Sequence, residues 1–343
     1  MHLALSVTID VSEFRSVARL IPEKYKVLRD LGHGRTGRVF HVRNRCTGED
    51  IALKLTNALN SEHSPQREST LQAMCSHGNV VKVLDAYAHG LGFIIEMEYM
   101  PQGSLSDALA RKFVPVPDSI AYVRQILSGL SWVHRKGILH RDMTAENIML
   151  SDDVAKLSDF GAAIDTASKE IASGFLYEPY LAPETQESGA FSVASDIFGV
   201  GITLLRAVNN LYQFHVRLTE ARRKLQPETN LADLIGFGNF VPPKLRRIIR
   251  KAVSFDPAER YTSAAAFKEE LDRLKPVRWW SRLNDATWAC KYRGQEEIIR
   301  LSPGAYPCTV HTIAGRERSR RHHRNMAEAN DHLLAIVATT TLQ

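Results

Sequence analysis

The sequence predicts an α+β protein with two unequal lobes, a small one built on an antiparallel sheet and a larger one that is mainly helical. Short runs that alternate apolar and polar residues fill the chain from 25 to 97. A break follows at 101–104, and beyond it apolar residues recur at helical spacing, as over 120–133. At 343 residues the chain is long enough to give both lobes a core.

The small lobe is expected to contain five strands and one main helix. Two alternating runs flank a glycine cluster, as two strands around a tight loop do. The expected strands cover 25–31, 38–42, 51–55, 80–84 and 93–97, and the helix covers 66–75.

The large lobe is expected to centre on residues 197–208, which are almost entirely apolar and predict a helix that is buried all round. Residues 271–276 have the composition expected at the end of the last packed helix. In residues 1–24, only 12–20 predicts a short amphipathic helix. The chain therefore divides into an N-terminal extension (1–24), a domain over 25–275 with small lobe 25–97, hinge 98–104 and large lobe 105–275, and a C-terminal extension (276–343).

Composition indicates a soluble globular protein, with 44% apolar and 24% charged residues. The apolar run 332–338 is too short to span a membrane, and the first residues lack a basic start and a cleavage site. Four scattered cysteines predict reduced thiols in an intracellular protein of the cytoplasm or nucleus, with neither a zinc site nor disulfides. The sequence does not determine the oligomeric state.

The positive charge is concentrated in the C-terminal extension, where 10 Lys and Arg face 6 Asp and Glu. Its basic run, 315–324, is expected to be solvated and flexible; the alternatives are a nuclear-import signal or a contact with a polyanion. Nucleic acid is therefore not the expected partner, although this basic run leaves it open. Trp279, Trp280 and Trp288 are expected to pack on the large lobe rather than to stack on bases.

The glycine cluster has the spacing GxGxxG, with Gly32, Gly34 and Gly37. Glycines allow a backbone to turn sharply and to bring its N–H groups close to phosphate oxygens. A dinucleotide-binding fold would need a helix directly after them, but a strand-like run follows. The cluster is therefore either a phosphate-covering loop or a plain hairpin turn.

Lys54 lies 17 residues beyond Gly37, inside an apolar strand. It is either a strand-edge lysine whose stem reaches solvent, or an ammonium group that faces a cleft and neutralises phosphate charge. Glu68, on the predicted helix, can hold the ammonium group in place.

Two short motifs carry the chemistry, His140-Arg141-Asp142 with Asn147 and Asp159-Phe160-Gly161. Asp142 can orient a substrate hydroxyl and accept its proton, and Asn147 can bind a metal ion. Asp159 can chelate Mg²⁺ that bridges nucleotide phosphates, because oxygen ligands suit that hard cation. Both motifs, in this order and with strands between them, indicate a phosphoryl-transfer site.

Over 25–275 the chain resembles the eukaryotic-type protein kinases, with the glycine loop, Lys54 and both motifs in kinase order. Further matches lie at 77–79, 182–184, 195–201 and 256–260. The resemblance implies the bilobal kinase fold, ATP and Mg²⁺ as cofactors, and a protein substrate that is phosphorylated on Ser or Thr.

The resemblance also implies roles for individual residues. Glu68, nine residues before His77, has the spacing of the helix glutamate that pairs with Lys54, but Gln72 stands where kinases place an apolar side chain. The implied catalytic residues are Asp142, Lys54 and Glu68, and the implied metal ligands are Asn147 and Asp159. ATP would be bound by Leu31, Gly32, Gly34, Gly37, Val39, Ala52, Lys54, Glu98, Met100 and Met149, with Met97 as gatekeeper, Glu184 and Arg260 as a structural ion pair, and Asp196 bracing the catalytic loop.

Three further positions depart from the family pattern. Thr144 stands where Ser/Thr kinases carry a lysine, Glu146 where tyrosine kinases can carry an arginine, and Tyr177 where a threonine bonds the catalytic aspartate. A missing cation weakens stabilisation of the transition state. Either the chain is an active kinase, similar in this respect to kinases of large DNA viruses, herpesviruses included, or it is a weak or inactive pseudokinase that serves as a nucleotide-binding scaffold. The intact metal ligands, Lys54 and Asp142 favour activity.

Arg141 points to regulation, because in similar kinases such an arginine receives a phosphate from the activation segment. Thr166, Ser168 and Ser173 are the available hydroxyl groups. The alternative is that they are ordinary loop residues.

Overall fold

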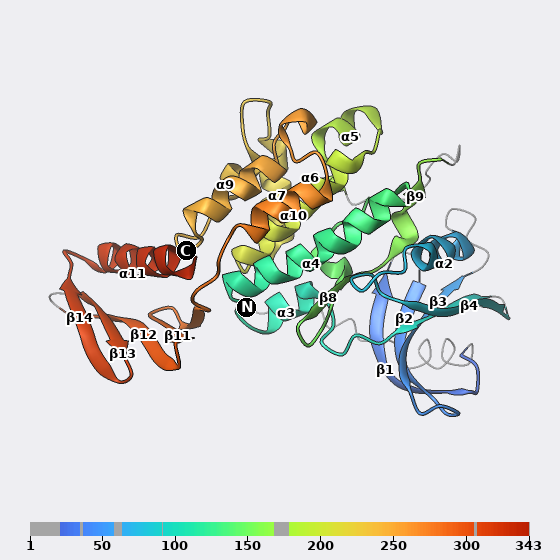
Figure 1. The fold of residues 1–343 in the computed structure, drawn as a ribbon, viewed down its shortest axis with the longest axis horizontal. Helices are drawn as coiled ribbons and strands as arrows, with labels where there is room; N and C mark the ends of the chain where they lie inside the picture. Colours follow the sequence, from blue (N-terminus) through green and yellow to red (C-terminus); the bar gives the residue numbers. More distant parts are fainter. Residues whose placement is uncertain are drawn as a thin grey trace.

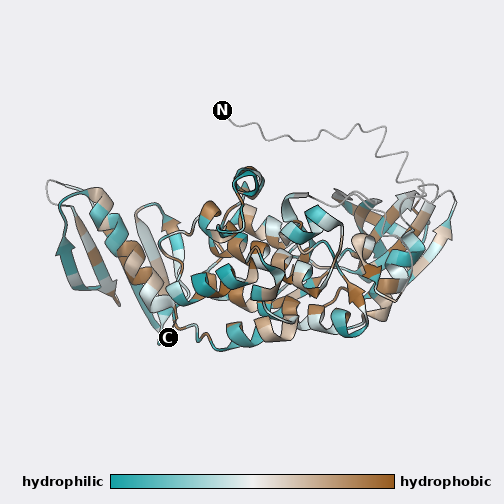
Figure 2. Ribbon diagram, turned by 90° about the horizontal axis from the view of Figure 1, so that it is seen from above, coloured by the Kyte–Doolittle hydropathy of each residue, from teal (hydrophilic) through white to brown (hydrophobic). Residues whose placement is uncertain are grey.

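The structure is a computed structural model that describes residues 21–34, 37–57, 64–90, 92–167, 178–304 and 307–342. Three units follow one another along its long axis: a small β lobe, a larger helical lobe and a C-terminal β unit (Figure 1). The view from above shows the same order (Figure 2). The predicted α+β bilobal architecture is confirmed, and the third unit is an addition to it.

The small lobe is a five-stranded antiparallel sheet in the order β1-β2-β3-β5-β4, with one helix, α2, against β4 and β5. Phe40, Leu53 and Ile94 are fully buried in its core. The elements are β1 (Tyr25–Gly34), β2 (Gly37–Asn44), β3 (Asp50–Asn57), α2 (Pro65–Met74), β4 (Val83–His89) and β5 (Gly92–Glu98). The helix expected over 12–20 lies outside the described residues.

The prediction of a strand over 80–84 was wrong in its bounds, since β4 begins at Val83 and continues to His89. Val80 forms a bridge with Leu157 of the large lobe, and the N–H of Val81 donates to the Leu157 carbonyl at 2.8 Å. The apolar run at 80–84 therefore links the two lobes before it enters the sheet.

The large lobe packs its helices around α6, in which every residue from Ser195 to Val208 is buried, as predicted. Two short strand pairs, β6 with β9 and β7 with β8, carry the loops that face the small lobe. The helices are α3 (Leu105–Arg111), α4 (Val116–Arg135), α5 (Pro183–Ser188), α6 (Val193–Val208), α7 (Phe214–Arg223), α8 (Leu231–Ile235), α9 (Pro243–Ala252) and α10 (Ala264–Asp272), and the strands are β6 (Ile138–Leu139), β7 (Ile148–Ser151), β8 (Val154–Leu157) and β9 (Ile164–Asp165).

The C-terminal unit is a five-stranded antiparallel meander covered on one face by α11. Leu333 and Val337 of α11 pack with Trp288 and Ile299 of the sheet. The elements are β10 (Ser281–Asn284), β11 (Thr287–Tyr292), β12 (Gln295–Ser302), β13 (Cys308–Ile313), β14 (Arg316–His322) and α11 (Met326–Thr341).

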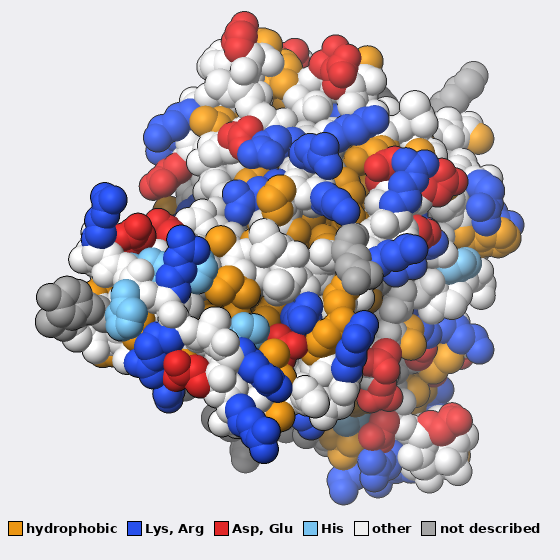
Figure 3. All heavy atoms as spheres, turned by 60° about the vertical axis from the view of Figure 1, so that its left-hand side comes forward, with side chains coloured by type: hydrophobic (Ala, Val, Ile, Leu, Met, Phe, Trp, Pro, Cys, Tyr) orange, Lys and Arg blue, Asp and Glu red, His pale blue; other side chains and the backbone are white. Residues whose placement is uncertain are grey.

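Two expectations about this unit were wrong. Residues 271–276 do not end the last packed helix, because α11 follows and buries an apolar side. The basic run 315–324 is not a flexible tail, because most of it forms edge strand β14, paired with β13. Every residue of β14 is nevertheless exposed. Figure 3, which brings this end of the molecule forward, shows Lys, Arg and His side chains over the surface, with Asp and Glu among them. No helix in the described part of the chain is long and apolar enough to cross a membrane.

Trp288 joins the C-terminal unit to the large lobe, in agreement with the prediction that this tryptophan packs on that lobe. Its ring centroid lies 5.0 Å from that of Phe113 and 5.1 Å from that of Phe240. Trp279 stays 46% exposed, and its Nε1 donates to Asp118 Oδ1 at 2.8 Å. Trp288 therefore provides an apolar contact between the C-terminal unit and the large lobe, and Trp279 adds a hydrogen bond between them.

Replacing Trp288 by alanine should loosen the C-terminal unit, because removal of a buried tryptophan costs about 3–5 kcal/mol. Limited proteolysis should then cut within 281–342 much faster than in the wild-type protein. Trp279→Ala is the matched control and should change the cleavage rate much less, since 46% of that residue is exposed and it contributes one hydrogen bond. Equal cleavage rates in the wild-type and Trp288→Ala proteins would contradict this role.

Candidate active site

A cavity of about 390 Å³ lies between the two lobes, a volume typical of small-molecule sites. It is lined by nine of the ten residues assigned to nucleotide binding, namely Leu31, Gly32, Gly37, Val39, Ala52, Lys54, Glu98, Met100 and Met149. Gly34 ends β1, and residues 35–36 beside it lie outside the described residues. The predicted gatekeeper, Met97, also lines the cavity. The structure thus gathers residues from both lobes and the hinge around one space.

Two positions at the mouth of this cavity require glycine. A Cβ atom on Gly37 would lie 2.5 Å from the carbonyl oxygen of Leu55, so no side chain fits there. Gly32 has φ +118°, a conformation that residues with a side chain rarely adopt. The backbone at Gly32 and Gly37 can therefore come close to a ligand in the cavity.

Lys54 is held between two carboxylates at the inner end of the cavity. Its Nζ lies 2.6 Å from Glu68 Oε1 and 3.2 Å from Asp159 Oδ1, and its side chain is buried. Burial alone would lower the pKa of Lys54, but Asp159 and Glu68 raise it above its usual value. Burial would likewise raise the pKa of Asp159, but Lys54 and the N–H of Gly161 hold it below its usual value. At neutral pH the site therefore contains an ammonium group beside an ionised carboxylate.

The register of α2 depends on a buried amide. Gln72 is 2% exposed, and its Nε2 donates to the carbonyl oxygen of Val81 at 2.8 Å. This bond satisfies the polar group at a position where kinases carry an apolar side chain. One turn earlier on the same helix, Glu68 then faces Lys54.

Two side chains fix the loop that carries Asp142: Asp196, which lies outside the loop, and Asn147, which belongs to it. Asp196, 2% exposed, accepts hydrogen bonds from the backbone N–H groups of His140 at 2.9 Å and Arg141 at 2.8 Å. Arg141 has φ 70°, a left-handed conformation that costs free energy unless surrounding bonds hold it. Within the loop, Nδ2 of Asn147 donates to Asp142 Oδ2 at 2.9 Å. The position of the Asp142 carboxylate is thus set by two other side chains.

Asn147 and Asp159 both line the cavity and fit a hard divalent cation. The amide nitrogen of Asn147 is used within the loop, which leaves its oxygen for a cation, and Asp159 offers an ionised carboxylate. The described residues contain no group of three or more His, Cys, Asp and Glu that could hold a metal by itself. Mg²⁺ needs only one or two protein ligands when phosphate oxygens and water supply the others.

Arg206 is a residue of this region that the sequence did not indicate as functional. Its Nη1 lies 2.8 Å from Glu146 Oε1, and its Nη2 donates to Ser106 Oγ at 2.7 Å. The guanidinium group, buried in α6, neutralises the carboxylate that lines the cavity next to Asn147. Thr144, two residues after Asp142, is buried and donates its N–H to the Asp142 carbonyl at 3.0 Å. In the sequence, Arg206 stands out only as the one charged residue in the apolar run 197–208.

The residues proposed for regulation are only partly described. Arg141 stacks on Phe191 at 4.0 Å from the ring centroid, and burial lowers its pKa to about 10. The hydroxyl of Thr166 donates to the Gly137 carbonyl at 2.8 Å, not to Arg141. Ser168, Ser173 and Tyr177 lie outside the described residues. The regulatory role of Arg141 stays a prediction.

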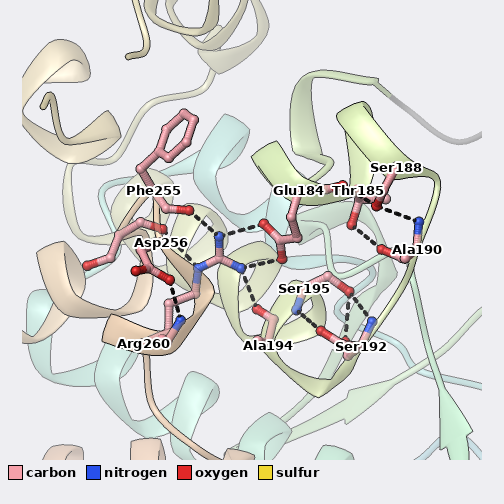
Figure 4. A network of polar contacts seen from close by, with 12 residues as sticks. Glu184, Thr185, Ser188, Ala190, Ser192, Ala194, Ser195, Phe255, Asp256 and Arg260 are labelled. Atoms are coloured by element: carbon pink, nitrogen blue, oxygen red, sulfur yellow. Dashed lines mark hydrogen bonds and ion pairs between the residues drawn. The ribbon is translucent and has the colours of Figure 1, made fainter. Parts of the chain in front are cut away.

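Glu184 and Arg260 do not line the cavity but form an ion pair within the large lobe. Figure 4 shows this pair with the residues that bond to it. The two side chains form a bidentate pair, with distances of 2.7 and 2.8 Å, and the Arg260 side chain is 0% exposed. Arg260 also donates to the carbonyl oxygens of Ala194, Ser254 and Phe255. It ties the start of α5 to the segment before α10.

Replacing Arg260 by leucine should lower the free energy of unfolding by about 3–5 kcal/mol, because it leaves a half-buried carboxylate and three carbonyl groups without their donor. Urea denaturation measures this change. The control is Arg282→Leu, whose ion pair with Asp285 is exposed and should be worth less than about 1 kcal/mol. Similar losses in both variants would contradict the structural role of Arg260.

Comparisons with known proteins agree with this geometry. The family model described as "Protein kinase domain" matches residues 25–271. The serine/threonine-protein kinase pkn3 of Myxococcus xanthus is 31% identical over 293 residues, which cover 79% of this chain and 53% of that protein. The serine/threonine-protein kinases pakA of Talaromyces marneffei and ste20 of Emericella nidulans are 28% and 30% identical, over 77% and 73% of this chain.

The chain spans about half the length, or less, of these curated relatives, namely 53% of pkn3, 43% of pakA and 30% of ste20. They come from two fungi and a bacterium, so the resemblance to viral kinases stays a prediction. The family match covers the small lobe, the hinge and nearly all of the large lobe, and it contains every residue around the inter-lobe cavity. The chain belongs to the protein kinase family.

Proposed function

We propose that this protein transfers the γ-phosphoryl group of ATP to a serine or threonine hydroxyl of a protein substrate, with Mg²⁺. The observation that carries the proposal is the ammonium group of Lys54, held between Glu68 and Asp159 inside the inter-lobe cavity. A buried cation beside an ionised carboxylate suits a ligand with phosphate groups and a divalent metal. The Ser/Thr preference is supported by the names of the relatives alone.

Each residue then has one task. The backbone at Gly32 and Gly37 covers the phosphates, and Lys54 neutralises part of their charge. Mg²⁺, held by Asn147 and Asp159, would supply further positive charge to the phosphate oxygens. Asp142 orients the acceptor hydroxyl and takes up its proton. Positioning and electrostatic stabilisation account for most of the catalysis in this class of reaction.

Phosphoamino-acid analysis after incubation with radiolabelled ATP, MgCl₂ and generic protein substrates tests the proposal. We expect phosphoserine or phosphothreonine, and loss of labelling when EDTA removes the metal. A thermal-shift assay with ATP and Mg²⁺ runs beside it. Stabilisation by nucleotide without any transfer would instead support the nucleotide-binding scaffold, and phosphotyrosine alone would overturn the Ser/Thr assignment.

A further inference from the structure

A second groove, of about 450 Å³, lies on the large lobe between α9 and α10. It shares no lining residue with the inter-lobe cavity. One wall carries Lys244, Arg247 and Lys251 of α9, and the other carries Glu270 of α10 with Arg273 just beyond it. The groove therefore combines four cations with one carboxylate.

The three cations of α9 form one stripe. Their spacing of three and four residues places them on the same side of the helix. At a rise of about 1.5 Å per residue, the first and the last Cα atoms are about 10 Å apart along the axis. The stripe is long enough to contact several residues of a bound chain.

The positive charge of this stripe is not neutralised within the described part of the protein. The other two cations of α9 are used there: Arg246 donates to carbonyl groups that include that of Val241, and Arg250 pairs with Asp233 at 2.7 Å. No ion pair with a described residue reaches Lys244, Arg247 or Lys251. Glu270 is itself paired with Arg273. The groove thus has a clear excess of positive charge.

The floor of the groove is apolar but offers no free aromatic face. Ile248, Tyr261 and Leu274 line it and are 8%, 6% and 6% exposed. The ring of Tyr261 stacks on Phe267 with centroids 4.7 Å apart, and Lys251 Nζ lies 4.8 Å from the same ring. A base would find no open ring to stack on, which disfavours single-stranded nucleic acid. A concave site between two helices also fits a chain better than a flat membrane surface.

We propose that this groove binds an acidic segment of a partner protein in extended form. An extended chain advances about 3.3 Å per residue and points successive side chains to opposite faces, so carboxylates two residues apart lie on one face, about 6–7 Å apart. Neighbouring cations of the stripe are about 4.5 and 6 Å apart along the helix axis, which is close to that spacing. An apolar side chain on the other face of the bound chain can contact the apolar residues of the groove, Ile248 and Leu274. Complementary charge then provides specificity, and the apolar contact adds affinity. This binding is separate from phosphoryl transfer and does not depend on it.

Fluorescence anisotropy of a fluorescein-labelled twelve-residue peptide, with six Asp or Glu and two Leu, tests the proposal on the full chain at about physiological salt. The triple variant Lys244→Glu/Arg247→Glu/Lys251→Glu should bind the peptide about tenfold more weakly, or worse. The matched control is Arg316→Glu/Arg318→Glu/Arg321→Glu on the exposed strand β14, which changes the net charge equally and should alter binding less than twofold. Lys244→Arg/Lys251→Arg should retain binding, and Asp142→Asn should bind as the wild type does.

Several results would overturn the proposal. Equal losses in the two triple variants would show general attraction to a basic protein. Tighter binding of a twelve-nucleotide DNA strand or of phosphatidylserine vesicles, lost in the α9 variant, would assign the groove to another ligand. Absence of peptide binding at millimolar concentration would also overturn it. If the triple variant melts early, the single variant Arg247→Glu, on an exposed side chain, replaces it in every comparison.

Discussion

Replacing Asp142 by asparagine should lower the rate of phosphoryl transfer by about 10²–10⁴-fold, the range typical of a lost general base. Asparagine has nearly the same size, and its amide oxygen can still accept the hydrogen bond that Asn147 donates at 2.9 Å. The loop should therefore keep its shape, because Asp196 fixes its backbone independently. What is lost is the negative charge that orients the acceptor hydroxyl and takes up its proton.

The effect should fall on kcat rather than on nucleotide binding. Transfer measured at saturating ATP gives the first quantity, and the thermal shift produced by ATP and Mg²⁺ gives the second. Asp153→Asn, an exposed aspartate in the turn between β7 and β8, is the matched control and should behave as the wild type does. Transfer at wild-type rate in Asp142→Asn would exclude this carboxylate from the reaction.

The parts of the site that the sequence predicted are those in which the chemistry fixes residue types at short spacing. Asp142 with Asn147, and Asp159 with its glycine, each lie within a few residues of one another, so they stand out without knowledge of the fold. The fold class followed from the change in apolar spacing near the hinge, which depends on local geometry.

The parts that the sequence did not predict depend on partners outside their own helix or strand. Gln72 is buried because it meets the carbonyl of Val81, and Arg206 because it meets Glu146, 60 residues earlier. An isolated charge in an apolar helix, such as Arg206 in α6, suggests such a partner but does not identify it. The predicted start of β4 was wrong for the same reason, since Val81 bonds to Leu157 of the other lobe and not to the sheet.

The edge strand of the C-terminal unit, β14, could not be predicted from alternation. β14 has basic side chains on both faces and no apolar face, so period-two spacing does not reveal it. Helix α11 contains the apolar run 332–338. Leu333 and Val337 of this run are four residues apart, which is a helical spacing, and both are buried. Helical spacing within this short run therefore indicates the helix, although the run is too short to span a membrane.

The second large effect is expected from Lys54→Met. Phosphoryl transfer should fall by about 10²–10³-fold, the usual loss when one charge-stabilising group is removed from a transition state. Methionine fills a similar volume but leaves the phosphates without the ammonium group. Lys26→Met, on an exposed part of β1, is the matched control and should leave transfer unchanged.

This substitution also changes stability, and the two effects can be separated. The side chains of Lys54 and Glu68 are both buried, at 6% and 5% exposed. Removing the lysine therefore leaves the Glu68 carboxylate in the interior without its cation. Breaking a buried pair in this way costs about 3–5 kcal/mol. A loss of activity in Lys54→Met alone would therefore not distinguish a missing charge from a damaged fold.

The double variant Lys54→Met/Glu68→Gln distinguishes a missing ammonium group from a damaged fold, because glutamine removes the unpaired negative charge of Glu68. Urea denaturation should show that it regains most of the lost free energy of unfolding, whereas transfer should stay as low as in Lys54→Met. Since Asp159 keeps its bond from the Gly161 N–H at 3.2 Å, its carboxylate remains placed in both variants. If transfer returned together with stability, Lys54 would serve only to pair with Glu68, and phosphate neutralisation would have to come from another group.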